Sequence, residues 1–155
     1  MERKQFLKSI GVGAAFALTF PCLGGCSKSD DVEGEIKEEP ANVDFTIDLE
    51  SAEAAKLANN GGFILTKSST DLNYTDVVVV KNLEGVFVAA SQICSHESYD
   101  QVRFANVDGG IFYCDVHGSR FSQTGTPLNQ VDSKAAKPLK VYNTTLTGTM
   151  LRVFE

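Results

Sequence analysis

The sequence predicts an all-β domain over residues 44–155. Short runs rich in Val, Ile, Phe, Tyr and Thr alternate with Gly, Asn, Asp and Ser, which is typical of strands joined by tight turns. Helix is scarce, since only Ala52 to Ala58 favours about two helical turns. The chain has 155 residues, 43% of them apolar, which suffices for one domain with its own core.

Eight of these runs are expected to be strands. Between them, the segments Asn82–Gly85, Asp108–Gly110 and Thr147–Gly148 contain residues that tolerate positive φ, so each is expected to close a hairpin. The expected strands are Phe45–Leu49, Gly62–Thr66, Val77–Lys81, Val86–Ser91, Val102–Val107, Ile111–Tyr113, Leu139–Thr144 and Met150–Phe154.

Residues 1–25 are expected to be a signal peptide of the lipoprotein type. A basic head that contains Arg3, Lys4 and Lys8 precedes an apolar run over residues 10–20, which is shorter than the roughly 20 residues that span a bilayer. The run leads to Leu-Gly-Gly-Cys at residues 23–26, which resembles a bacterial lipobox. That resemblance implies that Cys26 is lipidated and that the mature chain begins there.

The next segment, residues 26–43, is expected to be a flexible acidic tether. Residues 27–40 contain six acidic residues, two lysines and few apolar residues, so the segment has little to bury. The expected location is therefore a bacterial membrane, with the domain lipid-anchored and facing the periplasm or the cell surface. Without residues 1–25 the chain has 11 Lys and Arg against 19 Asp and Glu, a net charge of −8, which disfavours nucleic acid as a partner.

Cysteine and histidine are concentrated in two short motifs. Both histidines of the chain, and both cysteines beyond the leader, lie in Cys94-Ser95-His96 and in Cys114-Asp115-Val116-His117, seventeen residues further on. Each motif follows an expected strand, so two loops can close on one site. Because each motif offers one thiolate and one imidazole, the pattern favours a [2Fe-2S] cluster in which one iron takes both sulfurs and the other takes both nitrogens.

Two other readings of the motifs stay open. A Cys94–Cys114 disulfide would contribute about 3 kcal/mol by closing a loop, but it leaves both histidines unexplained. A zinc site with two cysteines and two histidines is chemically reasonable, although structural zinc usually takes like ligands in pairs from each half-site. Either reading would make the chain a structural lipoprotein without redox activity.

The two motifs, C-x-H and C-x-x-H, resemble those of the Rieske family, and the resemblance covers residues 44–155. It implies a Rieske-like antiparallel β-sandwich with a small cluster-binding subdomain of two loops, and one 2Fe-2S cluster per chain. Cys94 and Cys114 are the implied ligands of the inner iron, and His96 and His117 those of the outer iron. Gly118 and Ser119 are expected beside the cluster.

The resemblance also implies one-electron transfer, either as a free carrier or as the iron-sulfur subunit of a respiratory or oxidase assembly. The implied partner is a redox protein or a quinol, and the membrane is reached through the N-terminal lipid. We expect no enzymatic activity from the chain by itself, because a ring-hydroxylating oxygenase needs two further histidines for its mononuclear iron. High-potential members carry a tyrosine where this chain has Phe121, which implies a lower reduction potential here.

Overall fold

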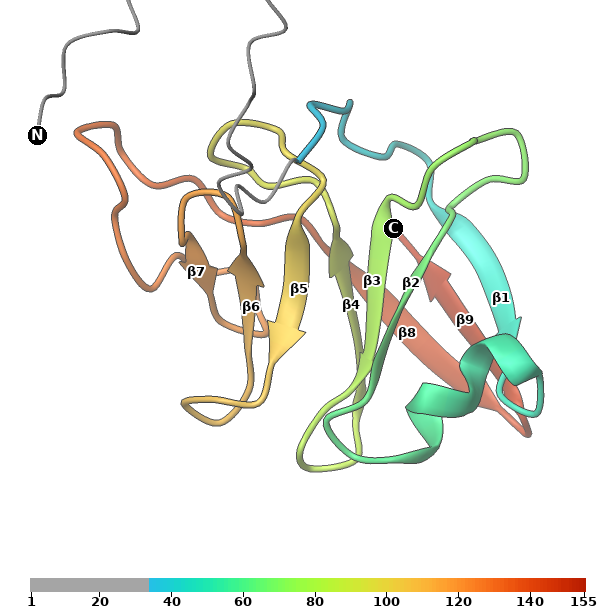
Figure 1. Ribbon diagram of the computed structural model, residues 1–155. Helices are drawn as coiled ribbons and strands as arrows, with labels where there is room; N and C mark the ends of the chain where they lie inside the picture. The colour runs from blue at the N-terminus through green and yellow to red at the C-terminus, as the bar shows by residue number, and fades with distance from the viewer. Residues whose placement is uncertain (1–33) are drawn as a thin grey trace, which may run out of the picture.

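The structure is a computed structural model that describes residues 34–155. The expected signal peptide, Cys26 and the first part of the expected tether lie outside the described residues. The described part is nearly all β, as predicted, with antiparallel strands in two sheets and one short helix (Figure 1). No helix within residues 34–155 is both long and apolar enough to cross a membrane.

The elements follow the chain in a simple order. The strands and the single 3-10 helix, η1, are β1 (Asp44–Asp48), η1 (Ala52–Ala58), β2 (Phe63–Thr66), β3 (Val77–Lys81), β4 (Phe87–Ser91), β5 (Val102–Ala105), β6 (Ile111–Cys114), β7 (Arg120–Phe121), β8 (Val141–Thr147) and β9 (Met150–Phe154). All eight expected strands are confirmed within a few residues, and the expected helix is present as a 3-10 helix. The Ser51 hydroxyl caps its N-terminus by accepting from the Ala54 N–H at 3.3 Å.

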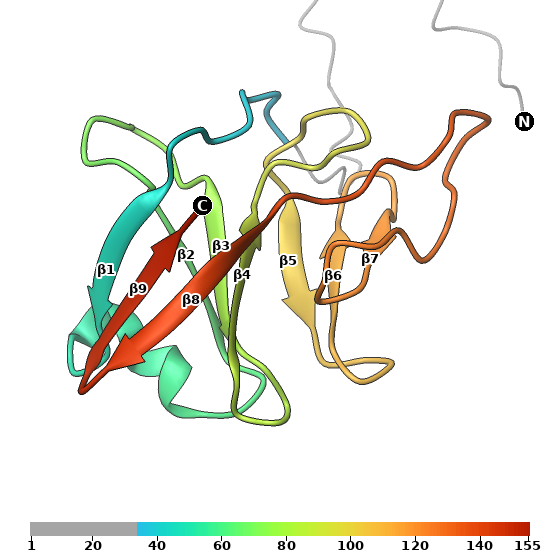
Figure 2. The same cartoon turned by 180° about the vertical axis from the view of Figure 1, so that it is seen from behind.

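Six strands form one curled sheet in the order β1-β9-β8-β4-β3-β2, and β5, β6 and β7 form a second sheet. Only two residue pairs join β4 to β8, Ala89 with Tyr142 and Ala90 with Val141. The view from behind shows β8 and β9 running diagonally across the end of the larger sheet (Figure 2). A short ladder between β4 and β8 lets the larger sheet curl instead of lying flat.

Strand β3 lies between two hydrophobic cores. Its four valines are fully buried, and because successive side chains point to opposite faces, Val77 and Val79 enter one core while Val78 and Val80 enter the other. A strand that is covered on both faces reads as a continuous apolar run rather than as an alternating one, as this run does. The first core also receives Leu57 of η1 and Leu151 and Val153 of β9.

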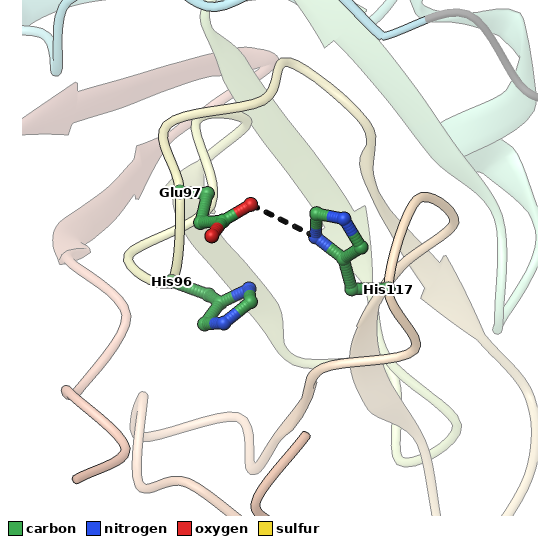
Figure 3. A group of neighbouring side chains, drawn as sticks. All are labelled: His96, Glu97 and His117. Atoms are coloured by element: carbon green, nitrogen blue, oxygen red, sulfur yellow. Dashed lines mark ion pairs between the residues drawn. The ribbon is translucent and has the colours of Figure 1, made fainter. Parts of the chain in front are cut away.

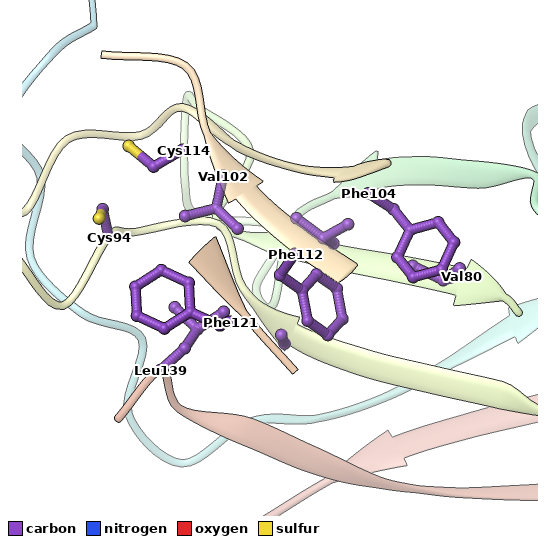
Figure 4. Packing of buried hydrophobic residues seen from close by; sticks show 10 residues of the cluster. Val80, Cys94, Val102, Phe104, Phe112, Cys114, Phe121 and Leu139 are labelled. Carbon is purple, nitrogen blue, oxygen red and sulfur yellow. The ribbon is translucent and has the colours of Figure 1, made fainter. Parts of the chain in front are cut away.

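The second core joins β3 and β4 to the smaller sheet. Phe104 and Phe112 meet edge to face, with ring centroids 5.7 Å apart, and Phe121 and Leu139 pack against the same cluster of residues. Figure 4 shows the sulfur atoms of Cys94 and Cys114 side by side at one end of this core. The core therefore fixes the strand ends from which both motifs start.

Two features of the chain differ from the sequence-based expectation. Strand β7 was not expected, because it is only two residues long; it pairs Phe121 with Phe112 and Arg120 with Tyr113. Residues 34–43, which the predicted tether included, contact the domain: Ile36 forms an isolated β-bridge with Tyr99, and Val43 is buried in the first core. We call residues 34–37 the strap.

Candidate metal centre

The two motifs lie on loops at the same end of the molecule. The first loop follows β4 and the second follows β6, and both strands end on the side where the strap lies (Figure 1). A backbone hydrogen bond of 3.1 Å from Asp115 N to Gln101 O joins the two loops directly. The two motif loops therefore lie next to one another in the structure.

Both loops are built on the same turn. In the first, Ser98 N donates to Cys94 O at 2.8 Å and Cys94 N donates to Tyr99 O at 2.8 Å. In the second, Gly118 N donates to Cys114 O at 3.0 Å and Cys114 N donates to Ser119 O at 2.9 Å. The residue four places after each cysteine has positive φ, 59° for Ser98 and 75° for Gly118. Each cysteine thus opens a turn of the same shape.

The two sulfur atoms are buried and are surrounded by hydrogen-bond donors. Cys94 and Cys114 are free thiols, and each sulfur accepts backbone N–H groups from the residues two and three places further along its own turn. The hydrogen bond from the Cys114 thiol is the largest cause that lowers the pKa of Cys94 to about 6. The same contact, with burial, raises the pKa of Cys114. Such a surrounding favours thiolate sulfur, the form that binds metals.

The two imidazoles face one another across the gap between the loops. The two ring centroids are 5.1 Å apart, and the ring planes are nearly perpendicular. Glu97 lies beside the rings, with its Oε2 3.5 Å from Nδ1 of His117 (Figure 3). A ring nitrogen of His96, a carboxylate oxygen of Glu97 and a ring nitrogen of His117 all lie within 4.8 Å of one another. Nδ1 of His96 is buried without a hydrogen-bond partner, which is a costly arrangement unless a further ligand occupies the position.

Gly118 and Ser119 lie at the end of the second turn. A Cβ on Gly118 would meet only Tyr113 Oη, at 3.5 Å, so among the protein atoms it is the positive φ that requires glycine there. The Ser119 side chain is buried and faces the Cys94 sulfur, where it helps to lower the pKa of that thiol, yet its Oγ forms no well-aligned hydrogen bond.

A third loop, residues 129–137, borders the site and was missed by the sequence-based analysis. Its Asn129 side chain donates to Gly118 O at 2.8 Å, and Ser95 Oγ donates to its Lys137 carbonyl at 2.9 Å. Its Asp132 lies 2.9 Å from Nε2 of His96, a contact that lowers the pKa of Asp132. A cavity of about 160 Å³ lies between this loop, His96 and Phe121. No motif marks these residues, because only the fold brings the loop to His96.

The donor set fits a cluster with sulfur and nitrogen ligands. Two buried sulfurs stand together on the core side, two imidazoles stand on the outer side, and one ring nitrogen lacks a partner. Thiolates suit iron-sulfur chemistry and imidazoles replace two of them in the asymmetric type of [2Fe-2S] centre. The arrangement can therefore hold such a centre with the nitrogen side toward the surface, where His117 is exposed.

The chain also matches a known protein family. The model of the Rieske [2Fe-2S] domain family matches residues 52–143, more than half of the chain, and no curated protein matches the chain. The solved structures that resemble it include the plasma membrane Rieske protein of the cyanobacterium Synechocystis, with 31% identity, a TM-score of 0.42, and coverage of 51% of this chain and 76% of that one. They also include the ferredoxin of carbazole 1,9a-dioxygenase from Nocardioides aromaticivorans, with 24% identity, a TM-score of 0.47, and coverage of 76% of this chain and 98% of that one.

Proposed function

Because the chain belongs to the Rieske [2Fe-2S] domain family, whose members are electron-transfer iron-sulfur proteins, we propose that Cys94, Cys114, His96 and His117 hold the cluster of this chain. The observation that supports the proposal is that both cysteines and both histidines meet in pairs across two matching turns. The sulfurs share a hydrogen bond, and the imidazole rings stand 5.1 Å apart. When bound, such a cluster accepts and releases one electron at a time.

The protein supplies distinct environments on the two sides of this site. The cysteine sulfurs lie in the second core, surrounded by Val102, Phe112 and Phe121 and by the N–H groups of their own turns. This surrounding excludes water and offers hydrogen bonds to negatively charged sulfur. The His117 side chain, in contrast, is 37% exposed. We infer that electrons enter and leave on the histidine side, because that side is accessible to a partner.

The surface around His117 favours a basic partner. Tyr99 packs edge to face against His117, with ring centroids 5.5 Å apart, and the neighbouring Ile36 is 69% exposed. Acidic residues adjoin this apolar patch: Glu97 lies beside His117, Asp100 accepts from Glu35 N, and Asp115 lies two residues before His117 in the chain. Complementary charges speed the encounter of redox proteins, so we propose a partner that presents a small apolar contact ringed by Lys and Arg.

We further propose that the domain is held at a membrane surface. The support is the Leu-Gly-Gly-Cys sequence that ends at Cys26 and the acidic segment that separates it from the strap. A lipid on Cys26 would leave only residues 27–33 between the anchor and the strap, and a flexible segment of that length spans on the order of 15 Å. The cluster end would then stay close to the membrane, within reach of a membrane-bound redox protein.

Metal and sulfide analysis of protein purified without oxygen tests the proposed site. Two irons and two acid-labile sulfides per chain, with visible absorption, are the expected result. One zinc per chain, or a metal-free protein with a Cys94–Cys114 disulfide, would instead identify a structural site. Lipidation is tested separately, by the mass of the N-terminal peptide from membranes of wild-type cells and of cells that carry Cys26→Ser.

A further inference from the structure

The two histidines of the site differ in what their outer nitrogens meet. The His96 side chain is 15% exposed, and its Nε2 lies 2.9 Å from Oδ2 of Asp132. The His117 side chain is 37% exposed. Its Nε2 forms no hydrogen bond with any of residues 34–155. The inner nitrogen of His96, Nδ1, is the buried atom without a partner. His96 is therefore closed on its outer side, and His117 is open.

Asp132 is held in place by its own loop. Its Oδ1 accepts from Lys134 N at 2.7 Å, and its main-chain carbonyl accepts from the Gln130 side chain at 2.7 Å. Lys134 Nζ also approaches both Asp132, at 3.9 Å, and Glu97, at 3.6 Å, and so links the third loop to the first. A carboxylate that is fixed by a turn and by a cation acts as a stationary acceptor rather than as a mobile surface charge.

We propose that Asp132 is a positioning residue for the cluster: it keeps the proton of His96 on Nε2, aims Nδ1 inward, and closes His96 to partners, so that contact with a partner is made at His117. A carboxylate that accepts the outer N–H of an imidazole fixes both the tautomer and the orientation of the ring, and so presents the other nitrogen to a metal. The proposal rests on the proposed function, because it takes His96 as a ligand through Nδ1.

Chemical modification of the histidines tests the proposal. Diethyl pyrocarbonate reacts with accessible imidazole nitrogen, and peptide mass spectrometry measures the rate at each histidine. In the wild-type protein His117 reacts first. In Asp132→Ala, modification of His96 becomes about tenfold faster, which corresponds to about 1.4 kcal/mol of lost protection, and Asp132→Asn gives a smaller increase because its amide oxygen still accepts.

Asp115→Asn is the matched control. It removes the same charge from an exposed position next to Cys114 in the chain. The hydrogen bond of His96 is with Asp132 and not with Asp115, so this variant leaves modification of His96 unchanged. The midpoint potential of the cluster gives a second readout: Asp132→Asn raises the potential more than Asp115→Asn does. The proposal is overturned if His96 reacts as fast as His117 in the wild-type protein, if both Asp132 variants leave its rate unchanged, or if the two Asn variants shift the potential equally.

The labelling is run on cluster-loaded and on metal-stripped protein. If the wild-type protein binds no cluster, the proposed function fails, whereas slow modification of His96 that depends on Asp132 still supports the contact. If the cluster is present and His96 is unprotected, the proposed function stands and the role of Asp132 fails.

Discussion

Gly34 lies against Val116, so the segment that precedes the first strand touches the second motif loop. A Cβ on Gly34 would come within 2.9 Å of Val116 Cγ2 and within 3.0 Å of Tyr99 Cδ1 in the first loop. The strap also forms backbone hydrogen bonds with the first loop, from Lys37 N to Ser98 O at 2.9 Å and from Asp100 N to Glu35 O at 3.0 Å. The strap thus contacts both loops of the candidate site.

Displacing the strap is expected to loosen the first loop. In Gly34→Val the added side chain has no room, so the hydrogen bond from Asp100 N is lost and exchange of that amide with solvent becomes roughly fivefold faster, as expected for a loss of about 1 kcal/mol. Hydrogen exchange measured by NMR or mass spectrometry checks this. Ile36→Ala is the control, because that side chain is 69% exposed; unchanged exchange in Gly34→Val would show that the strap does not brace the loop.

The matching turns predict unequal effects at matching positions. Ser98 and Gly118 both have positive φ, so Gly118→Ala should lower the free energy of unfolding by about 1–2 kcal/mol, since a Cβ is unfavourable in that region. Ser98→Gly should change stability by less than about 1 kcal/mol, because relief of strain offsets the greater freedom of the unfolded chain. Denaturant titration of both variants measures the difference. Equal stabilities would mean that the turn shape does not govern these positions.

Ser119 is expected to set part of the reduction potential. Its hydroxyl is buried, faces the Cys94 sulfur and has no well-aligned partner among the protein atoms, and a hydrogen bond that it would donate to a charged cluster sulfur contributes about 1.5–3 kcal/mol. Ser119→Ala should therefore lower the midpoint potential by about 60–130 mV, since about 1.4 kcal/mol corresponds to 59 mV for one electron. Protein-film voltammetry measures the shift. Ser122→Ala, in the turn after β7, serves as the control; a similar shift in both variants would exclude the assigned role of Ser119.

Electron transfer to a basic partner should depend on ionic strength. With a small basic c-type cytochrome as acceptor, the second-order rate constant should fall as salt is raised, because charges more than about 10 Å apart are screened at 0.1 M. Asp115→Lys should slow the reaction several-fold at low salt. Glu84→Lys changes charge equally in the β3–β4 turn, at the opposite end of the molecule (Figure 1). Equal slowing by the two variants would argue against docking over His117.

The strands and the two motif loops were predictable because their signals are local. Alternating and continuous apolar runs mark β3 and its neighbours, and positive-φ residues mark the turns, such as Gly85 and Gly148. Because each motif contains one cysteine and one histidine, the sequence also indicated that the two motifs form one site. In the structure the two histidine rings pair with one another, and so do the two cysteine sulfurs; their role as ligands stays a prediction.

What the sequence did not reveal depends on contacts between distant segments. The strap is charged and poor in apolar residues, so its composition indicates disorder. Its order comes from backbone hydrogen bonds, which do not depend on side-chain type and so leave no pattern in the sequence. Asp132 lies in a polar loop without a motif. Its contact with His96 could not be predicted, because only the fold brings the two residues together. The ladder between β6 and β7 joins Phe112 to Phe121, and two residue pairs are too few to give a periodic signal.

Low-temperature EPR of the reduced protein tests whether the two cysteines and two histidines hold the cluster. We expect a signal with the low average g value of a [2Fe-2S] centre that has both nitrogen and sulfur ligands. His96→Cys and His117→Cys should each convert or abolish this signal, whereas the surface variant Glu84→Gln should retain it. Persistence of the wild-type signal in either histidine variant would contradict the assignment of the four ligands.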